Sequence, residues 1–145
     1  MTRSLILLLL IFPTALILAN THGVAPYDRV DLSTFKTFAL REGYPASKDT
    51  KLDQAVHGAI RAALTSKGIK ETLESPELVV SYRVEVATQR KEVTGIVVID
   101  LTNSATNTTI WHGQHIDDEE SSAKLEKRLP DAIRKMFSNN PSKKK

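Results

Sequence analysis

From Leu78 to Ala87 an apolar side chain occupies every second position of the chain. The apolar set is Leu78, Val80, Tyr82, Val84 and Val86, and the residues between them include Ser81, Arg83 and Glu85. Successive side chains of a β-strand point to opposite faces of a sheet, so this spacing predicts a strand. One buried face and one partly wet face are typical of antiparallel sheets.

Two further strands are predicted after this one. Ile96 to Leu101 is apolar on both faces until Asp100, which favours a place inside the sheet. The polar residues Thr88 to Thr94 are expected to connect it to the preceding strand. Thr108 to Ile116 is predicted to return beside it, because the short polar segment Asn103 to Asn107 is typical of a hairpin turn.

A helix is predicted from Asp49 to Lys67, because apolar residues recur there at helical spacing. The stripe consists of Leu52, Val56, Ile60 and either Ala63 or Leu64, widened by Ala55 and Ala59. Thr50 followed by Asp53 resembles a capping box, and Gly68 suits the left-handed position after a helix. The opposite, solvated face is expected to carry Asp53, His57 and Arg61.

A second amphipathic helix is predicted near the end of the chain. Its apolar stripe consists of Leu125, Leu129, Ile133 and either Met136 or Phe137. The acidic run Asp117 to Glu120 is expected to form its solvated N-terminus, where negative charge favours the helix dipole. Pro130 within the stripe predicts either a kink or a fresh helix start.

These elements predict an α+β fold. A weaker strand is predicted from Lys36 to Leu40, before the first helix. It follows an extended segment at residues 20–31 and a short turn at Ser33. The expected architecture is a mainly antiparallel sheet of about four to five strands with two helices packed on one face. A chain of 145 residues has about the length of one domain, which we place at residues 26–138, followed by a polar, lysine-rich tail at 139–145.

The first 25 residues are typical of a secretory signal peptide. Arg3 supplies a positive start, and Leu5 to Ala19 is apolar except for Thr14. A run of about fifteen residues is short for a membrane span, which takes about twenty. We expect cleavage near residues 19–25 and export to the periplasm or the medium. The alternative is an uncleaved leader that anchors the chain in the inner membrane.

Four motifs in a fixed order resemble a known family. They are FKTFAL at residues 35–40, AIRAALTSKG at 59–68, SPELVVSY at 75–82, and GIVVIDL with TIWHG within 95–113. Together they resemble the domain of unknown function family 4136, small bacterial envelope proteins that are mostly lipoproteins. The resemblance implies an envelope location and a similar fold, and it implies no catalytic residues.

The chain departs from that family pattern in two ways. Members commonly carry an aromatic residue where this chain has Leu40, and many begin with a lipid-accepting cysteine. This chain has no cysteine at all. Disulfide bonds, thiol catalysis and thiolate metal sites are therefore excluded.

The charge of the chain argues against a nucleic-acid partner. The formal net charge is +3, but removing Arg3 and the terminal lysines 143–145 from the 20 basic residues leaves 16 against 17 acidic residues. A nucleic-acid binder spreads its basic residues over a folded face or along a helix. The lysine tail could contribute at most a weak, salt-sensitive contact with anionic lipid.

Polar residues are densest from His112 to Glu120, and the histidines and acids of this segment are the candidate ligands of a metal site. On a strand, His112 and His115 point to opposite faces, and only His115 and Asp117 share one. Two ligands are too few for a structural zinc site, so no metal is predicted. Asp100 is interpreted as a turn-capping residue before Thr102.

Trp111 and Tyr82 are interpreted as core or cross-strand packing residues. A partner is expected to dock on the wet sheet face that carries Ser81, Arg83 and Glu85.

The function expected from the sequence is that of a non-enzymatic envelope protein that binds a protein, glycan or lipid. No cofactor and no catalytic residue is predicted. One alternative is a small periplasmic hydrolase that uses His115, Asp117 or Asp100. Another is a membrane-surface protein held by its uncleaved leader. The sequence does not determine the oligomeric state.

Overall fold

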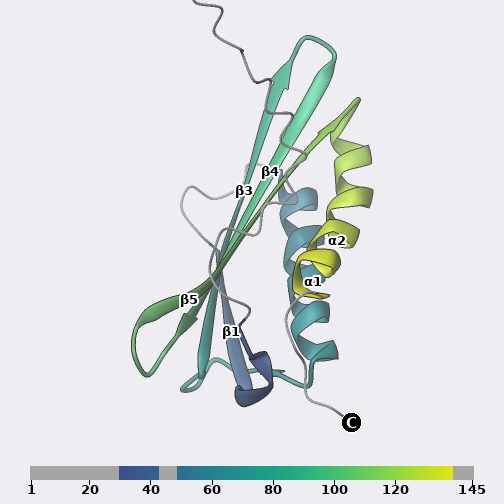
Figure 1. Ribbon diagram of the computed structural model, residues 1–145. Coiled ribbons are helices and arrows are strands. Elements are labelled where there is room, and N and C mark those ends of the chain that lie inside the picture. The colour runs from purple at the N-terminus through teal and green to yellow at the C-terminus, as the bar shows by residue number, and fades with distance from the viewer. Residues whose placement is uncertain (1–29, 43–48, 139–145) are drawn as a thin grey trace, which may run out of the picture.

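The computed structural model describes residues 30–42 and 49–138 (Figure 1). The predicted leader, the loop expected around Gly43 and Pro45, and the lysine tail lie outside the described residues. The described elements are η1 (Leu32–Thr34), β1 (Thr37–Glu42), α1 (Thr50–Ser66), β2 (Lys70–Glu71), β3 (Leu78–Gln89), β4 (Glu92–Asn103), β5 (Thr108–Glu119) and α2 (Ser122–Ser138).

The strands form one five-stranded sheet in the order β2-β1-β3-β4-β5. Figure 1 shows α1 and α2 on the same side of this sheet, and no described helix covers the other side. The antiparallel meander β3-β4-β5 confirms the predicted fold class. The other two pairings, of β1 with β2 and with β3, are parallel, with Phe38 opposite Leu78.

The core lies between the helices and the sheet. Both predicted helical stripes are buried except for Ala55, which is half-buried, and Trp111 and Tyr82 are buried as the sequence predicted. The indole of Trp111 is 1% exposed and stacks on Phe137 of α2 with ring centroids 5.2 Å apart. Burying a single large apolar side chain contributes about 1.5–3 kcal/mol, so these stripes hold the helices on the sheet.

The start of α1 differs from the prediction. Its N-cap is Asp49, whose side chain accepts hydrogen bonds from the backbone N–H groups of Lys51 and Leu52. The predicted capping box of Thr50 and Asp53 is therefore wrong, because Thr50 is already helical. The C-terminal prediction is confirmed, since Gly68 has φ 83°.

The last two elements also differ from the prediction. Residues Asp117 to Glu119 continue strand β5, and α2 begins only at Ser122. The acidic run is therefore not the N-terminus of the helix. Pro130 lies inside the continuous helix α2, so a fresh helix start there is wrong.

The β3–β4 hairpin is longer than predicted. The expected polar connection Thr88 to Thr94 is mostly strand, and only Arg90 and Lys91 form the turn. Arg90 adopts φ 57°, a left-handed value within this tight connection. The paired strands run from Leu78 opposite Asn103 to Gln89 opposite Glu92.

Candidate functional site

The sheet face opposite the helices is called the uncovered face. Its described residues include Arg41, Ser81, Arg83, Glu85, Ile96, Val98, Asp100, His112, Gln114 and Ile116. This is the wet face that the sequence predicted from Ser81, Arg83 and Glu85. The strand register now shows which residues of β1, β4 and β5 share it.

A polar row crosses four strands of the uncovered face. Arg41 of β1 lies opposite Ser81 of β3, Ser81 lies opposite Asp100 of β4, and Asp100 lies opposite His112 of β5. Directly opposed side chains on neighbouring strands are close enough to interact. The row therefore brings a cation, a hydroxyl, a carboxylate and an imidazole together from distant parts of the sequence.

Asp100 and His112 form a hydrogen-bonded pair within this row. Nδ1 of His112 lies 2.6 Å from Oδ1 of Asp100, and their side chains are 29% and 39% exposed. An ionised carboxylate only accepts hydrogen bonds, so Nδ1–H of the imidazole is the donor. The interpretation of Asp100 as a turn-capping residue is wrong, because Asp100 lies within β4 and bonds across the sheet.

The order of the row is not that of a nucleophilic triad. In such a triad the histidine lies between the serine and the aspartate, so that it can take the serine proton. In the row, Asp100 lies between Ser81 and His112. Within the described part of the chain, Asp100 and His112 thus form a pair, but Ser81 does not lie beside Nε2, the imidazole nitrogen that is not bonded to Asp100.

A shallow depression of about 500 Å³ lies at one end of the polar row. Its described lining consists of Arg41, Ser75, Pro76, Val79, Ser81, Thr102, Ser104 and Asn107. Arg41 and Ser81 belong both to the row and to this depression, so the two features are continuous. Sequence reasoning missed it, because residues from two loops and three strands meet there only after the parallel pairing of β1.

The cluster of histidines and acids from His112 to Glu120 lies partly on the helix-covered face of the sheet. His115 is 6% exposed on the helix-covered side, whereas His112 is on the uncovered face, so their predicted separation is confirmed. Nε2 of His115 is 3.8 Å from Oδ2 of Asp117. No group of three potential metal ligands forms among residues 30–42 and 49–138.

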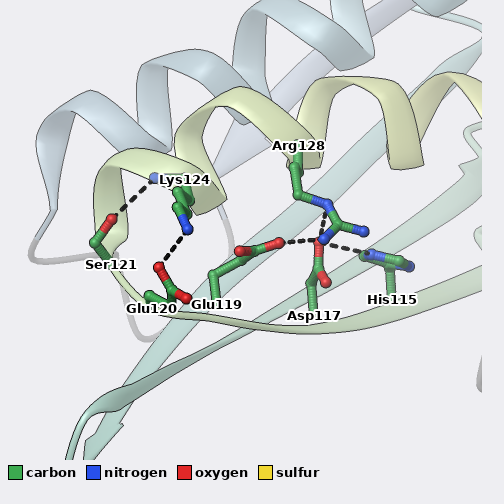
Figure 2. A network of polar contacts seen from close by, with 7 residues as sticks. All are labelled: His115, Asp117, Glu119, Glu120, Ser121, Lys124 and Arg128. Atoms are coloured by element: carbon green, nitrogen blue, oxygen red, sulfur yellow. Dashed lines mark hydrogen bonds and ion pairs between the residues drawn. The ribbon is translucent and has the colours of Figure 1, made fainter.

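Arg128 of α2 joins this buried-side cluster (Figure 2). Its Nε lies 3.4 Å from Oδ2 of Asp117, and its Nη1 donates to Glu119. The bond to Glu119, with the nearby negative charge of Asp117, raises the pKa of the Arg128 guanidinium. These contacts fasten α2 to β5, so the cluster is interpreted as a structural brace.

The acidic run makes one more contact at the start of α2. Lys124 donates to the carboxylate of Glu120, as Figure 2 shows. That hydrogen bond lowers the pKa of Glu120 and raises the pKa of Lys124. Both side chains are exposed, so the pair orients the first turn of the helix and contributes little to stability.

A second polar cluster joins α1 to the sheet. Nε of Arg61 lies 2.6 Å from Oε2 of Glu71, and Nη2 lies 3.1 Å from Oε1. This hydrogen bonding lowers the pKa of the Glu71 carboxyl. His57 stacks on Tyr82 at 5.8 Å, and the Tyr82 hydroxyl is 3.5 Å from Oδ2 of Asp53.

The solvated helix face predicted for Asp53, His57 and Arg61 is therefore only partly correct. Arg61 is exposed, but Asp53 and His57 are half-buried. Their spacing of four residues indicated that they share a face. It could not show that Tyr82 of β3 lies against them.

The whole folded region matches one family. Residues 24–142 match the family model described as Domain of unknown function (DUF4136). The chain belongs to this family. The resemblance inferred from the four motifs is thereby confirmed. A search of curated proteins finds no match.

Two solved structures share the fold of this DUF4136 domain. One is the PelC dodecamer from Paraburkholderia phytofirmans, with 11% identity, a TM-score of 0.61, and coverage of 84% of this chain and 97% of that chain. The other is a PDZ domain protein from Parabacteroides distasonis, with 16% identity and a TM-score of 0.60. That match covers 85% of this chain but only 35% of the other.

These similarities establish the architecture alone, because the identities are low. Among the described helices, none is long and apolar enough to cross a membrane. The alternative of an anchoring leader concerns residues 1–25, which are not described, and it stays a prediction.

Proposed function

We propose that this domain is an exported, non-enzymatic protein of the bacterial envelope that binds its ligand on the uncovered face. The observation that carries the proposal is the asymmetry of the sheet. Both helices pack on one side, and the other side presents the polar row from Arg41 to His112. Export is supported by the leader-like first 25 residues and by the family resemblance.

The chemistry of the uncovered face favours a polar ligand. Among the described large apolar side chains of this face, Ile116 is the one that is more than a third exposed, at 37%. The centres of protein–protein interfaces are rich in aromatic groups. The described residues of this face include the aliphatic Ile96, Val98 and Ile116 but no Phe, Tyr or Trp. Its hydroxyls, carboxylate, imidazole and guanidinium instead offer both donors and acceptors to a hydrogen-bonding ligand.

The site geometry favours binding over hydrolysis. Asp100 and His112 are paired, but Ser81 lies on the far side of Asp100 from the imidazole. The other residues considered for catalysis, His115 and Asp117, face the helices, and Asp117 pairs with Arg128 of α2. A substrate panel with wild type, Asp100→Asn and His115→Ala tests the hydrolase alternative. Activity that is lost in either variant would revive it.

Site-specific photocrosslinking in intact cells tests the proposal. A photoreactive amino acid replaces Arg83 on the uncovered face, and a control variant carries it at Lys127, an exposed position of α2. We expect a defined adduct at position 83 and none at 127. Equal labelling at both positions, or labelling at 127 alone, would contradict a binding role for the uncovered face.

Export is tested separately by sequencing the N-terminus of protein recovered from the producing cell. We expect a new N-terminus between residues 19 and 26 in the periplasmic fraction. An intact Met1 in the membrane fraction would instead support the anchored alternative.

A second candidate function is that of a subunit in a homo-oligomeric envelope assembly. The similar PelC structure is a dodecamer. In the described chain, β5 is an edge strand of 12 residues that pairs on one side with β4. An exposed strand edge is a template for pairing with another chain. Native mass spectrometry of the mature protein tests this, and a monomer at micromolar concentration would contradict it.

A further inference from the structure

We infer that the depression around Arg41 is an oxyanion site that holds a phosphate group of the ligand. The inference rests on the proposed binding function of the uncovered face and adds the chemical class of what is bound there. Three observations carry it: the composition of the lining, the lack of an ion pair at Arg41 among the described residues, and the backbone conformation of Ser75.

The lining combines one cation with hydrogen-bond donors and no described acid. Hydroxyls come from Ser75, Ser81, Thr102 and Ser104, and an amide comes from Asn107. The neighbouring depression, by contrast, includes Glu77. Phosphate oxygens accept hydrogen bonds from guanidinium, hydroxyl and amide groups, and an arginine can hold two of them in one plane. A lining of this kind matches an oxyanion.

Arg41 differs from the other arginines of the described strands and helices in having no ion-pair partner. The others pair with carboxylates: Arg61 with Glu71, Arg83 with Glu85, Arg128 with Asp117 and Glu119, and Arg134 with Asp131. The positive charge of Arg41 is therefore available to a ligand. The acid next along the row, Asp100, is already engaged by His112.

One residue of the depression has a costly backbone conformation. Ser75 has φ 47°, a left-handed value that disfavours serine, and it precedes Pro76, which further restricts its conformation. Asn107, with φ 52°, also lines the depression, in a conformation that asparagine commonly adopts in turns. Such conformations persist where the surrounding structure fixes them, and they cluster at ligand sites.

Titration of the purified mature protein with inorganic phosphate in a phosphate-free buffer tests the inference. The readout is the amide chemical shifts in NMR spectra, with sodium chloride at matched ionic strength as the reference. We expect saturable shifts at Ser75, Ser104 and Asn107. Arg41→Gln should weaken binding at least about tenfold, because it removes a charge-assisted contact.

The matched control is Arg134→Gln, which removes an exposed arginine of α2 that already has a partner in Asp131 and lies away from the uncovered face. It should bind phosphate as wild type does. The inference is overturned if no saturable shift appears, if Arg41→Gln binds as wild type, or if both variants lose binding equally. Thermal unfolding of each variant verifies that it is folded.

Vesicles distinguish the source of the phosphate. Phosphatidylglycerol vesicles are compared with phosphatidylcholine vesicles, using wild type and Arg41→Gln. Binding of phosphate and of phosphatidylglycerol, both lost in the variant, supports the site and assigns a lipid headgroup. Phosphate binding without vesicle binding supports the site with a free or glycan-linked phosphate. Photocrosslinking at position 83 that persists when phosphate fails to bind would retire this inference and leave the proposed function standing.

Discussion

Replacing Gly113 by alanine should destabilise the domain strongly. A β-carbon at Gly113 would lie 2.3 Å from Cη2 of Trp111, 2.9 Å from its Cζ2 and 2.6 Å from Cε of Met136. Carbon atoms in contact are about 3.5–4.0 Å apart, so neighbouring groups must move by more than about 1 Å. The methyl end of Met136 can move, but the Trp111 ring is buried and stacked on Phe137.

Overpacking of a close-packed core typically costs about 1–3 kcal/mol, and this overlap falls at the upper end. We expect Gly113→Ala to lower the free energy of unfolding by about 2–3 kcal/mol, a large fraction of the 5–15 kcal/mol typical of a domain. Urea titration measures it, followed by far-UV circular dichroism and by the fluorescence of Trp111, the single tryptophan.

A double-mutant cycle tests the cause. Trp111→Phe removes the two ring carbons that the new methyl group meets, so Gly113→Ala should cost clearly less in that background. The reasoning is refuted if Gly113→Ala changes stability by less than about 0.5 kcal/mol, the range of a neutral surface substitution. Equal costs in both backgrounds would refute the role of Trp111.

Three further results are expected. Gly58→Ala should raise the free energy of unfolding by about 0.5–1 kcal/mol, because a β-carbon there meets nothing within 4 Å and alanine favours the helix; a loss in urea titration would contradict this. Arg128→Gln should lower stability by releasing α2 from β5, and faster amide exchange at the start of α2 would show it. Glu71→Gln should cost more near about pH 7 than near about pH 3. The hydrogen bond to Arg61 lowers the pKa of Glu71 in the folded protein below its ordinary value. The stabilisation by the Glu71 carboxylate is therefore complete above the ordinary pKa and is lost as the pH falls through the lowered pKa. A difference in stability between wild type and variant that does not change with pH would contradict the role of Arg61.

The spacing of apolar residues predicted where the helices and strands lie, because buried side chains recur with the period of each kind of element. The stripe of α1 and the alternation in β3 are strong local signals, and both were predicted correctly. The acidic residues Asp117 to Glu119 were misassigned because their charge suits a helix N-terminus. In the structure, Arg128 of α2 pairs with two of them on a strand, a contact between two elements that charge alone does not predict.

The candidate site was harder to predict from the sequence than the helices and strands. The wet face of β3 was identified from Ser81, Arg83 and Glu85, because one strand carries all three. The neighbours of Ser81 depend on register, and the parallel pairing that places Arg41 beside it leaves no local signal. For the same reason Asp100 was interpreted as a turn residue, although it bonds to His112 twelve residues away.

The most direct test of the central claim is the yield of photocrosslinked adduct at Arg83 relative to Lys127 in intact cells. The uncovered face carries position 83, and the solvent side of α2 carries position 127. If the uncovered face binds the ligand, a defined adduct forms at 83 and is absent at 127. Equal yields at the two positions, in folded and exported protein, would contradict the account.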